Sequence, residues 1–165
     1  MSQIEGRVWT FGDNISTDDI VPGQYLKLTT DEIAKHVMEG VDPEFPSKVR
    51  PGDILVARKN FGCGSSRESA PAAIKHAGIR AVIAEFFARI FYRNAINLGL
   101  PVIECKEASR IREGDIVVVR LGEGRIVNKS RNEEYRFSPY PKEVMEILEA
   151  GGLVEKLRQM AKSRE

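Results

Sequence analysis

The chain has 165 residues, with a formal net charge of +1, 30% charged residues and 42% hydrophobic residues. This length favours one domain over residues 1–165 with a substantial core, and the balanced charge excludes the basic surface of a nucleic-acid-binding protein. No apolar stretch is long enough to span a membrane and the first residues lack a signal-peptide pattern, so we expect a cytoplasmic protein.

The first third of the chain predicts one strand and one short helix, separated by loops. The strand is indicated by alternation of side chains, and the helix by Thr29 and Glu32, which have the spacing of a capping box. Prolines at positions 43 and 46 indicate a rigid connection after the helix. The expected elements are a strand over 4–11, a loop over 15–25, a helix over 29–39 and a rigid loop over 42–46.

The middle of the chain alternates short apolar runs with helical segments, which predicts parallel strands joined by right-handed crossovers. Beyond residue 104 the pattern changes to strands separated by turns, and C-terminal helices follow, interrupted by Gly151 and Gly152. We therefore expect an α/β fold in which helices pack on a partly parallel sheet with antiparallel additions. The expected elements are strands over 54–57, 80–84, 102–104, 115–121, 125–128 and 134–137, and helices over 70–77, 86–98 and 142–161.

A turn of unusual composition, Gly62-Cys-Gly-Ser-Ser-Arg-Glu68, joins the buried strand over 54–57 to an alanine-rich helix. Glycines, hydroxyls and a guanidinium at a strand-to-helix corner can hold an anion on backbone N–H groups. A structural interpretation is equally open, since Ser65 and Glu68 also have the spacing of a capping box. Pro71 limits the start of the regular helix to about residues 69–70.

The cysteines and histidines predict no metal site in this chain. Cys63 and Cys105 are too few for a disulfide scaffold or for an iron–sulfur cluster, which normally takes three or four thiolates. His36 and His76 fall in separate helical segments without metal-ligand spacing, so we expect both on helix surfaces. If a metal takes part in the chemistry, another chain must hold it.

The turn lies in the second of three sequence motifs that occur in a fixed order along the chain: Gly12 to Leu26, Asn60 to Glu68, and Ala84 to Pro101. Together they closely resemble the small subunit of the aconitase-like isomerases, the isopropylmalate isomerase and homoaconitase group, over about residues 8–103. The resemblance implies a swivelling β/β/α domain like the mobile fourth domain of aconitases. It also implies a large-subunit partner that carries a 4Fe–4S cluster, and a small hydroxy-dicarboxylic or tricarboxylic acid as substrate.

Aconitase-like isomerases remove water from a hydroxy acid and return the hydroxyl to the neighbouring carbon. The resemblance implies that iron in the large subunit binds the departing hydroxyl, and that Ser65 takes the proton from a carbon next to a carboxylate. A neutral serine is a poor base, so its alkoxide needs N–H donors and a cation, which this turn and Arg67 can supply. Arg67 is also expected to clamp a substrate carboxylate, with Ser66 as a supporting donor.

Asp18 matches an acidic residue of the family near the active-site arginines, which implies that it orients Arg67 or a loop amide. An Asx-turn in a polar loop is an equally open alternative. Arg89 and Arg93 lie one helical turn apart and are expected to face solvent, with the large subunit or a sheet edge as alternatives. Cys63 has no neighbouring histidine, which argues against a nucleophilic role. Helical spacing predicts a set of core side chains in the third motif: Phe86, Phe87, Ile90, Phe91 and Ile96.

The loop after Tyr25 distinguishes the side group of the substrate in this family, so Lys27 and Leu28 are expected to bind substrate. Lys27 stands where carboxylate-selecting members have arginine, and a lysine offers a point charge without the arginine fork. Leu28 favours an apolar substituent. We therefore expect isomerisation of 2-isopropylmalate and 3-isopropylmalate in leucine biosynthesis, with homoaconitase activity in lysine biosynthesis or dual specificity as the alternative.

Two functions of other classes remain open at this point. The chain can be a non-catalytic carboxylate-binding module that uses the same anion-holding turn without an isomerase partner. A serine hydrolase is a weaker alternative, because the sequence has no Gly-x-Ser-x-Gly elbow and its histidines have no triad context.

Overall fold

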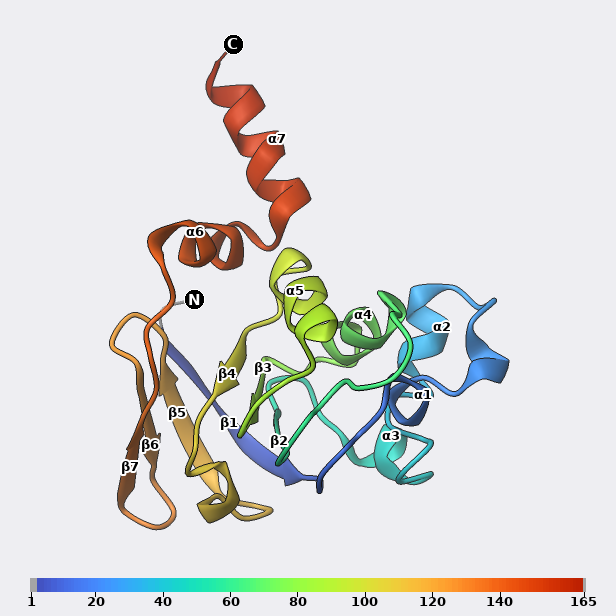
Figure 1. Ribbon diagram of the computed structural model, residues 1–165, viewed down its shortest axis with the longest axis vertical. Coiled ribbons are helices and arrows are strands. Elements are labelled where there is room, and N and C mark those ends of the chain that lie inside the picture. The colour runs from blue at the N-terminus through green and yellow to red at the C-terminus, as the bar shows by residue number, and fades with distance from the viewer. Residues whose placement is uncertain (1–2, 165) are drawn as a thin grey trace.

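A computed structural model describes residues 3–164, which form a seven-stranded mixed sheet with helices packed against it (Figure 1). The strands are β1 (Gln3–Thr10), β2 (Ile54–Val56), β3 (Ala81–Ala84), β4 (Val102–Glu104), β5 (Ile116–Arg120), β6 (Arg125–Asn128) and β7 (Glu133–Arg136). The α-helices are α1 (Thr17–Ile20), α2 (Thr30–Ala34), α3 (Phe45–Lys48), α4 (Ser69–His76), α5 (Arg89–Asn97), α6 (Lys142–Ala150) and α7 (Leu153–Ser163). Two 3-10 turns, η1 (Gly23–Tyr25) and η2 (Ala108–Arg110), complete the elements.

The sheet has a parallel half and an antiparallel half, joined at β1. Its strand order is β4-β3-β2-β1-β5-β6-β7. Strands β1 to β4 pair in parallel, whereas β5 pairs antiparallel with β1 and continues into β6 and β7. This arrangement confirms the parallel run and the antiparallel additions predicted from the sequence.

Successive residues of the parallel strands contribute to two hydrophobic clusters, because neighbouring side chains of a strand point to opposite faces of a sheet. Leu55 and Val82 belong to the cluster that packs beneath the helices. Ile54 and Ile83 belong to a second cluster, which also contains Val117 and other side chains of the antiparallel strands. The antiparallel half therefore curls over one face of the parallel half, while the helices cover the other face.

The first third of the chain contains more helix than its sequence indicates. Ser16 and Asp19 form a capping box that starts α1, so the segment 15–25 is not the plain loop predicted from its composition. The predicted capping box of Thr29 and Glu32 is confirmed, although α2 ends at Ala34, earlier than expected. In the rest of the chain each predicted strand and helix is present: the strands over 102–104 and 125–128 have the predicted ends, and the ends of the other elements are shifted. Within residues 3–164, no helix combines the length and apolar composition that a membrane span requires.

Helix α5 begins at Arg89 rather than at residue 86. The Ala88 N–H donates to the carbonyl of Phe61 at 2.9 Å, and Ala88 keeps an extended backbone with a ψ of 137°. Phe87, Phe91 and Ile96 are buried as predicted. The prediction of a core position is wrong for Phe86, which is 45% exposed, and for Ile90, which is 52% exposed.

The pairing of β1 with β2 continues beyond the last residues of both strands. Backbone hydrogen bonds link the segment 11–17 to the segment 56–63 and place the turn after β2 beside the start of α1. Four have N···O distances of 2.7–2.8 Å and run from Phe11 N–H to Val56, from Asn14 N–H to Lys59, from Gly62 N–H to Ile15, and from Thr17 N–H to Cys63. A fifth, from Arg58 N–H to Gly12, is 3.3 Å long.

Gly62 is the position where this extended pairing meets α5. Its φ of +84° lies in the left-handed region, and a Cβ there would lie 2.3 Å from Cγ of Phe91. A side chain at this position is therefore excluded both by the backbone conformation and by the aromatic ring. The turn can approach α5 this closely only because residue 62 is glycine.

Candidate functional site

Residues 62–68, which we call the serine turn, lie between α1 and the start of α5. Ser65 and Ser66 are exposed, and Arg67 is half-buried. The turn borders a pocket of about 240 Å³. The side chains or backbone of Thr17, Gly62, Gly64, Ser65, Ser66, Arg67, Ala88, Arg89, Ile90, Phe91 and Asn94 line this pocket. The structure thus brings Ser65, Ser66 and Arg67 to one concave site.

The backbone of the serine turn offers hydrogen-bond donors to a ligand. Over residues 3–164, the N–H groups of residues 64–67 have no backbone or side-chain acceptor. Gly64 has a φ of +96°, which reverses the chain within the turn. Successive unpaired N–H groups in such a turn form a concavity that binds anions. The arrangement can hold a carboxylate or stabilise an alkoxide.

The structural interpretation of the Ser65 and Glu68 pair is wrong. Helix α4 begins at Ser69, its N-cap residue is Glu68, and no side chain caps it. Ser65 therefore lies outside the helix, and its hydroxyl is not used to start it. The limit that Pro71 set on the helix start is confirmed.

Arg67 is held in place by α1 and the residue after it. Its Nη1 donates to Oδ1 of Asp18 at 3.1 Å and to the carbonyl of Val21 at 2.9 Å. The arginine side chain is 21% exposed, whereas that of Asp18 is 68% exposed. In the described part of the chain, Nε and Nη2 of Arg67 have no hydrogen-bond partner. These donors are free for a carboxylate, so Asp18 has the contact expected of a residue that orients the arginine.

The loop of Lys27 and Leu28 does not line this pocket. Both residues are exposed, and the loop begins at Tyr25, whose hydroxyl donates to Oε1 of Glu39 at 2.6 Å. The ring of His36 stacks on Tyr25 at 3.8 Å, and its Nδ1 lies 2.7 Å from Oε2 of Glu39. The hydrogen bond from Tyr25, and then that from His36, lower the pKa of Glu39, and the same Tyr25 bond raises the pKa of Tyr25. These contacts fix the root of the loop and leave its tip open.

Of the remaining candidate residues, Arg89 lines the pocket, whereas Arg93 and Cys105 do not. Arg89 and Arg93 are both exposed, and Arg89 also reaches the sheet edge, where it binds the carboxylate of Glu104 and the carbonyl of Phe87. Burial raises the pKa of the Cys105 thiol to about 12, which leaves it unreactive. Between residues 3 and 164, no three His, Cys, Asp or Glu side chains gather as a metal site would require.

The pocket also contains residues that the sequence analysis did not place at the site, among them Thr17, Ile90 and Asn94. Thr17 stood in a segment that we expected to be a loop, and Ile90 was assigned to the core. Asn94 follows Ile90 by one helical turn, so both lie on the same side of α5. Phe86 and Ile90, both predicted as core, are four positions apart, and Asn94 is the next residue at this spacing. A polar residue at that position breaks the apolar pattern, and this break could have indicated Asn94.

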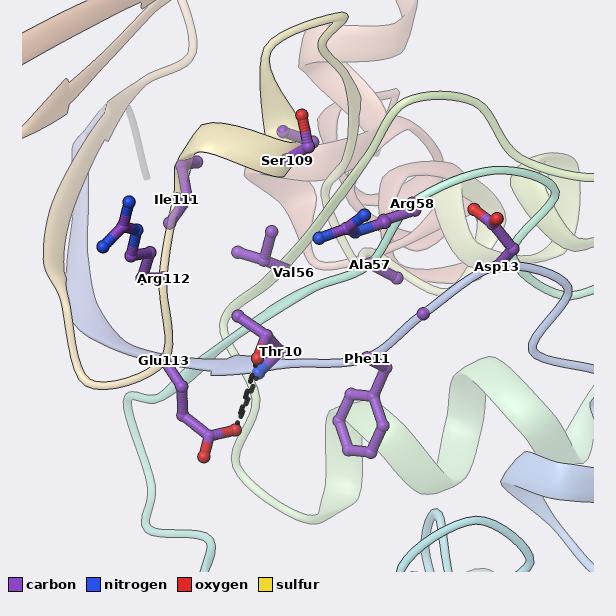
Figure 2. A pocket seen from close by; sticks show the side chains of 12 residues that line it. Thr10, Phe11, Asp13, Val56, Ala57, Arg58, Ser109, Ile111, Arg112 and Glu113 are labelled. Atoms are coloured by element: carbon purple, nitrogen blue, oxygen red, sulfur yellow. Dashed lines mark hydrogen bonds between the residues drawn. The ribbon is translucent and has the colours of Figure 1, made fainter.

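A larger pocket, about 670 Å³, lies at the carboxyl ends of β1 and β2 (Figure 2). Arg58 and Arg112 line it together with Asp13 and Glu113. The carboxylate of Glu113 accepts from the N–H of Thr10 at 3.2 Å. None of the candidate residues named from the sequence lines this pocket. Its charges have both signs, and the family resemblance implies no reacting residue there, so the serine turn remains the candidate active site.

Comparisons with known proteins found relatives over most of the chain. The aconitase C-terminal domain family matches residues 10–108. A 3-isopropylmalate dehydratase small subunit of Nautilia profundicola is 55% identical over 163 residues, which cover 98% of each chain. A methanogen homoaconitase small subunit of Methanothermobacter thermautotrophicus is 59% identical over 152 residues, which cover 92% of this chain and 88% of that one.

A solved structure gives the same result for the fold. The crystal structure of a 3-isopropylmalate dehydratase from Methanocaldococcus jannaschii matches with a TM-score of 0.92 and 49% identity, and the match covers 98% of both chains. The family match spans more than half of the chain, and it contains both α1 and the serine turn. The chain belongs to the aconitase C-terminal domain family.

Proposed function

We propose that the chain is the small subunit of a hydro-lyase that interconverts 2-isopropylmalate and 3-isopropylmalate in leucine biosynthesis. The observation that carries the proposal is the serine turn, where exposed hydroxyls, unpaired N–H groups and the free side of Arg67 meet in one pocket. Full-length similarity to a 3-isopropylmalate dehydratase small subunit supports the substrate class.

In the proposed reaction, Ser65 is the base. Its alkoxide oxygen takes the proton from a substrate carbon next to a carboxylate, and the electron pair of that C–H bond becomes a C=C double bond as hydroxide leaves the neighbouring carbon. Hydroxide then adds to the carbon that lost the proton, and Ser65 returns its proton to the other carbon, which completes the isomerisation and regenerates the alkoxide. The N–H groups of the turn and the charge of Arg67 stabilise the alkoxide, because fixed donors in a partly closed site need no reorganisation.

Arg67 and Ser66 bind the substrate in this proposal. The free Nε and Nη2 of Arg67 can make two parallel hydrogen bonds to a carboxylate, while Asp18 and the Val21 carbonyl hold Nη1. The Ser66 hydroxyl and N–H add donors to the same carboxylate. Such a clamp fixes the substrate so that the carbon to be deprotonated faces Ser65.

The reaction also requires a group that accepts the leaving hydroxide, and we propose that a large subunit provides it. A 4Fe–4S cluster in that subunit supplies a Lewis acid for the hydroxyl. The assignment of the cluster to the partner is supported by the aconitase-type family of this chain, and among residues 3–164 no three His, Cys, Asp or Glu side chains gather. The small subunit then contributes the base, the carboxylate clamp and part of the pocket wall.

The pocket opening is the surface that the large subunit must cover for the two halves of the site to meet. Ile90 lines this pocket and is 52% exposed, and Phe86, just before α5, is 45% exposed. Large apolar side chains that stay exposed beside a polar site are typical of an interaction surface. We therefore propose that Phe86 and Ile90 contact the large subunit.

Substrate selection is proposed to depend on the loop of Lys27 and Leu28. The loop tip is exposed, and its root at Tyr25 is fixed by Glu39 and His36. A tip of this kind can complete a pocket wall once the partner is bound. Homoaconitase activity remains the second candidate, because Lys27 offers a positive charge to a longer acid and a homoaconitase small subunit is 59% identical to this chain.

Replacement of the base tests the proposed chemistry. In the complex with the large subunit, Ser65→Ala should lower kcat by about 10²–10⁴-fold, the usual contribution of a general base, with little change in KM. Steady-state assays with 3-isopropylmalate measure both constants, and Ser109→Ala, outside the turn, is the matched control. Near-normal kcat in Ser65→Ala together with a large loss in Ser66→Ala would move the base to Ser66.

Replacement of the exposed isoleucine tests the partner surface. Ile90→Glu should weaken assembly with the large subunit by about tenfold or more, because it places a charge where an apolar contact is proposed. Analytical ultracentrifugation of the mixed subunits measures the change. Leu157→Glu is the control, since Leu157 is 55% exposed on α7, which projects from the body in Figure 1. Assembly that is lost with Leu157→Glu and kept with Ile90→Glu would place the interface on α7 instead.

Exchange of the loop residues tests substrate selection. Lys27→Arg combined with Leu28→Thr should raise the kcat/KM ratio of homoaconitate-type acids over isopropylmalate by about tenfold, the effect of one gained carboxylate pairing worth ~1.4 kcal/mol. A competition between the two acids measures this ratio directly, with Lys35→Arg as the control for an arginine elsewhere on the surface. An unchanged ratio would mean that the large subunit or another loop selects the substrate.

A further inference from the structure

We infer that Thr17 is a positioning residue of the proposed reaction, which aims the serine base by holding the peptide between Ser65 and Ser66. The inference rests on the proposed function and adds to it a residue that no catalytic argument has used. Thr17 is the first residue of α1 and is 2% exposed, which is unusual for a polar side chain at a helix start.

The contacts of Thr17 are directed at the serine turn. Its hydroxyl donates to the carbonyl oxygen of Ser65 at 2.8 Å, across 48 positions of sequence. Its backbone N–H donates to the carbonyl of Cys63, also at 2.8 Å. A Cβ at Gly64 would lie 3.5 Å from the Thr17 hydroxyl oxygen, so the turn packs directly against this side chain. Thr17 therefore fixes the turn on both sides of Gly64.

Holding one oxygen of a peptide fixes the orientation of the whole group, because the peptide bond is planar. The Ser65 carbonyl and the Ser66 N–H belong to the same peptide, so the Thr17 hydroxyl sets the direction of this N–H as well as the position of the Ser65 Cα. A carbonyl that accepts a hydrogen bond also makes the N–H of its own peptide a stronger donor. Thr17 thereby both places the base and strengthens a donor next to its oxygen.

The serine turn needs this support because the N–H groups of residues 64–67 are unpaired within the described chain. The bonds that restrain the turn come from the Gly62 N–H, from its carbonyl oxygens and from Arg67. Loss of the Thr17 hydroxyl would leave the Ser65 carbonyl without its contact to α1. Small errors in the position of a base reduce the rate strongly, whereas the carboxylate clamp of Arg67 would be unaffected.

An isosteric pair of variants tests the inference in the assembled complex. Thr17→Val keeps the shape and removes the hydroxyl, and it should lower kcat about tenfold with KM within about twofold of wild type, since the lost bond acts on the base and not on the clamp. Thr17→Ser retains the hydroxyl and should keep kcat within about twofold. Thr10→Val is the matched control, because the Thr10 hydroxyl donates to Glu113 away from the serine turn.

Hydrogen–deuterium exchange of the same complexes gives a reading that does not depend on activity. The amides of Gly62 and Thr17, which donate to Ile15 and Cys63, should exchange faster in Thr17→Val than in wild type, Thr17→Ser or Thr10→Val, whereas the unpaired amides of residues 64–67 exchange fast in all four. Wild-type kcat in Thr17→Val overturns the inference, and so does a Thr17→Ser variant as impaired as Thr17→Val, because the methyl group would then be responsible. Absence of isomerisation in the wild-type complex contradicts the proposed function itself and is thereby distinguished from failure of this inference.

Discussion

The backbone pairing that continues beyond β1 and β2 is the constraint on which the candidate site depends. Two segments that would otherwise be separate loops, 11–17 and 56–63, are joined by hydrogen bonds, four of them 2.7–2.8 Å long, so α1 and the serine turn are positioned as one unit. The two asparagines with left-handed backbones on these segments, Asn14 and Asn60, bond to each other through their side chains at 3.1 Å. The N–H groups of residues 64–67 can stay free for a ligand because these bonds between the two segments position the turn.

Helix α1 connects this framework to the rest of the site. Asp18 holds Arg67, Thr17 holds Ser65, and the carbonyl of Asp19 accepts the N–H of Gly40 at 3.1 Å, beyond the end of α2. A short helix of four residues has little stability of its own, so its position is determined by these tertiary contacts. The same helix therefore couples the residues of the proposed base and clamp to the segment that follows the selection loop.

Much of the fold could be predicted from the sequence because its elements carry strong local signals. Buried strands such as Ile54–Val56 are short apolar runs, and Thr29 with Glu32 marks a helix start. Local patterns could not show that Ser65 lies outside α4, because capping-box spacing is the same in both cases. They could not show that Ile90 is exposed either, since its apolar spacing resembles that of the buried Phe91. The contact of Thr17 with the serine turn depends on pairing across 48 positions, for which local patterns carry no signal, and the contact of Asp18 with Arg67 could be expected only from the family resemblance.

The central claim is that Ser65 removes the carbon-bound proton, and exchange of that proton with solvent measures this step directly. The complex of both subunits is incubated with 3-isopropylmalate in D₂O, and mass spectrometry follows deuterium at the substrate carbon from which the proton is removed. Exchange should occur with the wild-type complex and should fall by about 10²-fold or more in Ser65→Ala, in proportion to the loss of a general base, while the substrate still binds. Exchange at the wild-type rate in Ser65→Ala would contradict the account, because another group would then be the base.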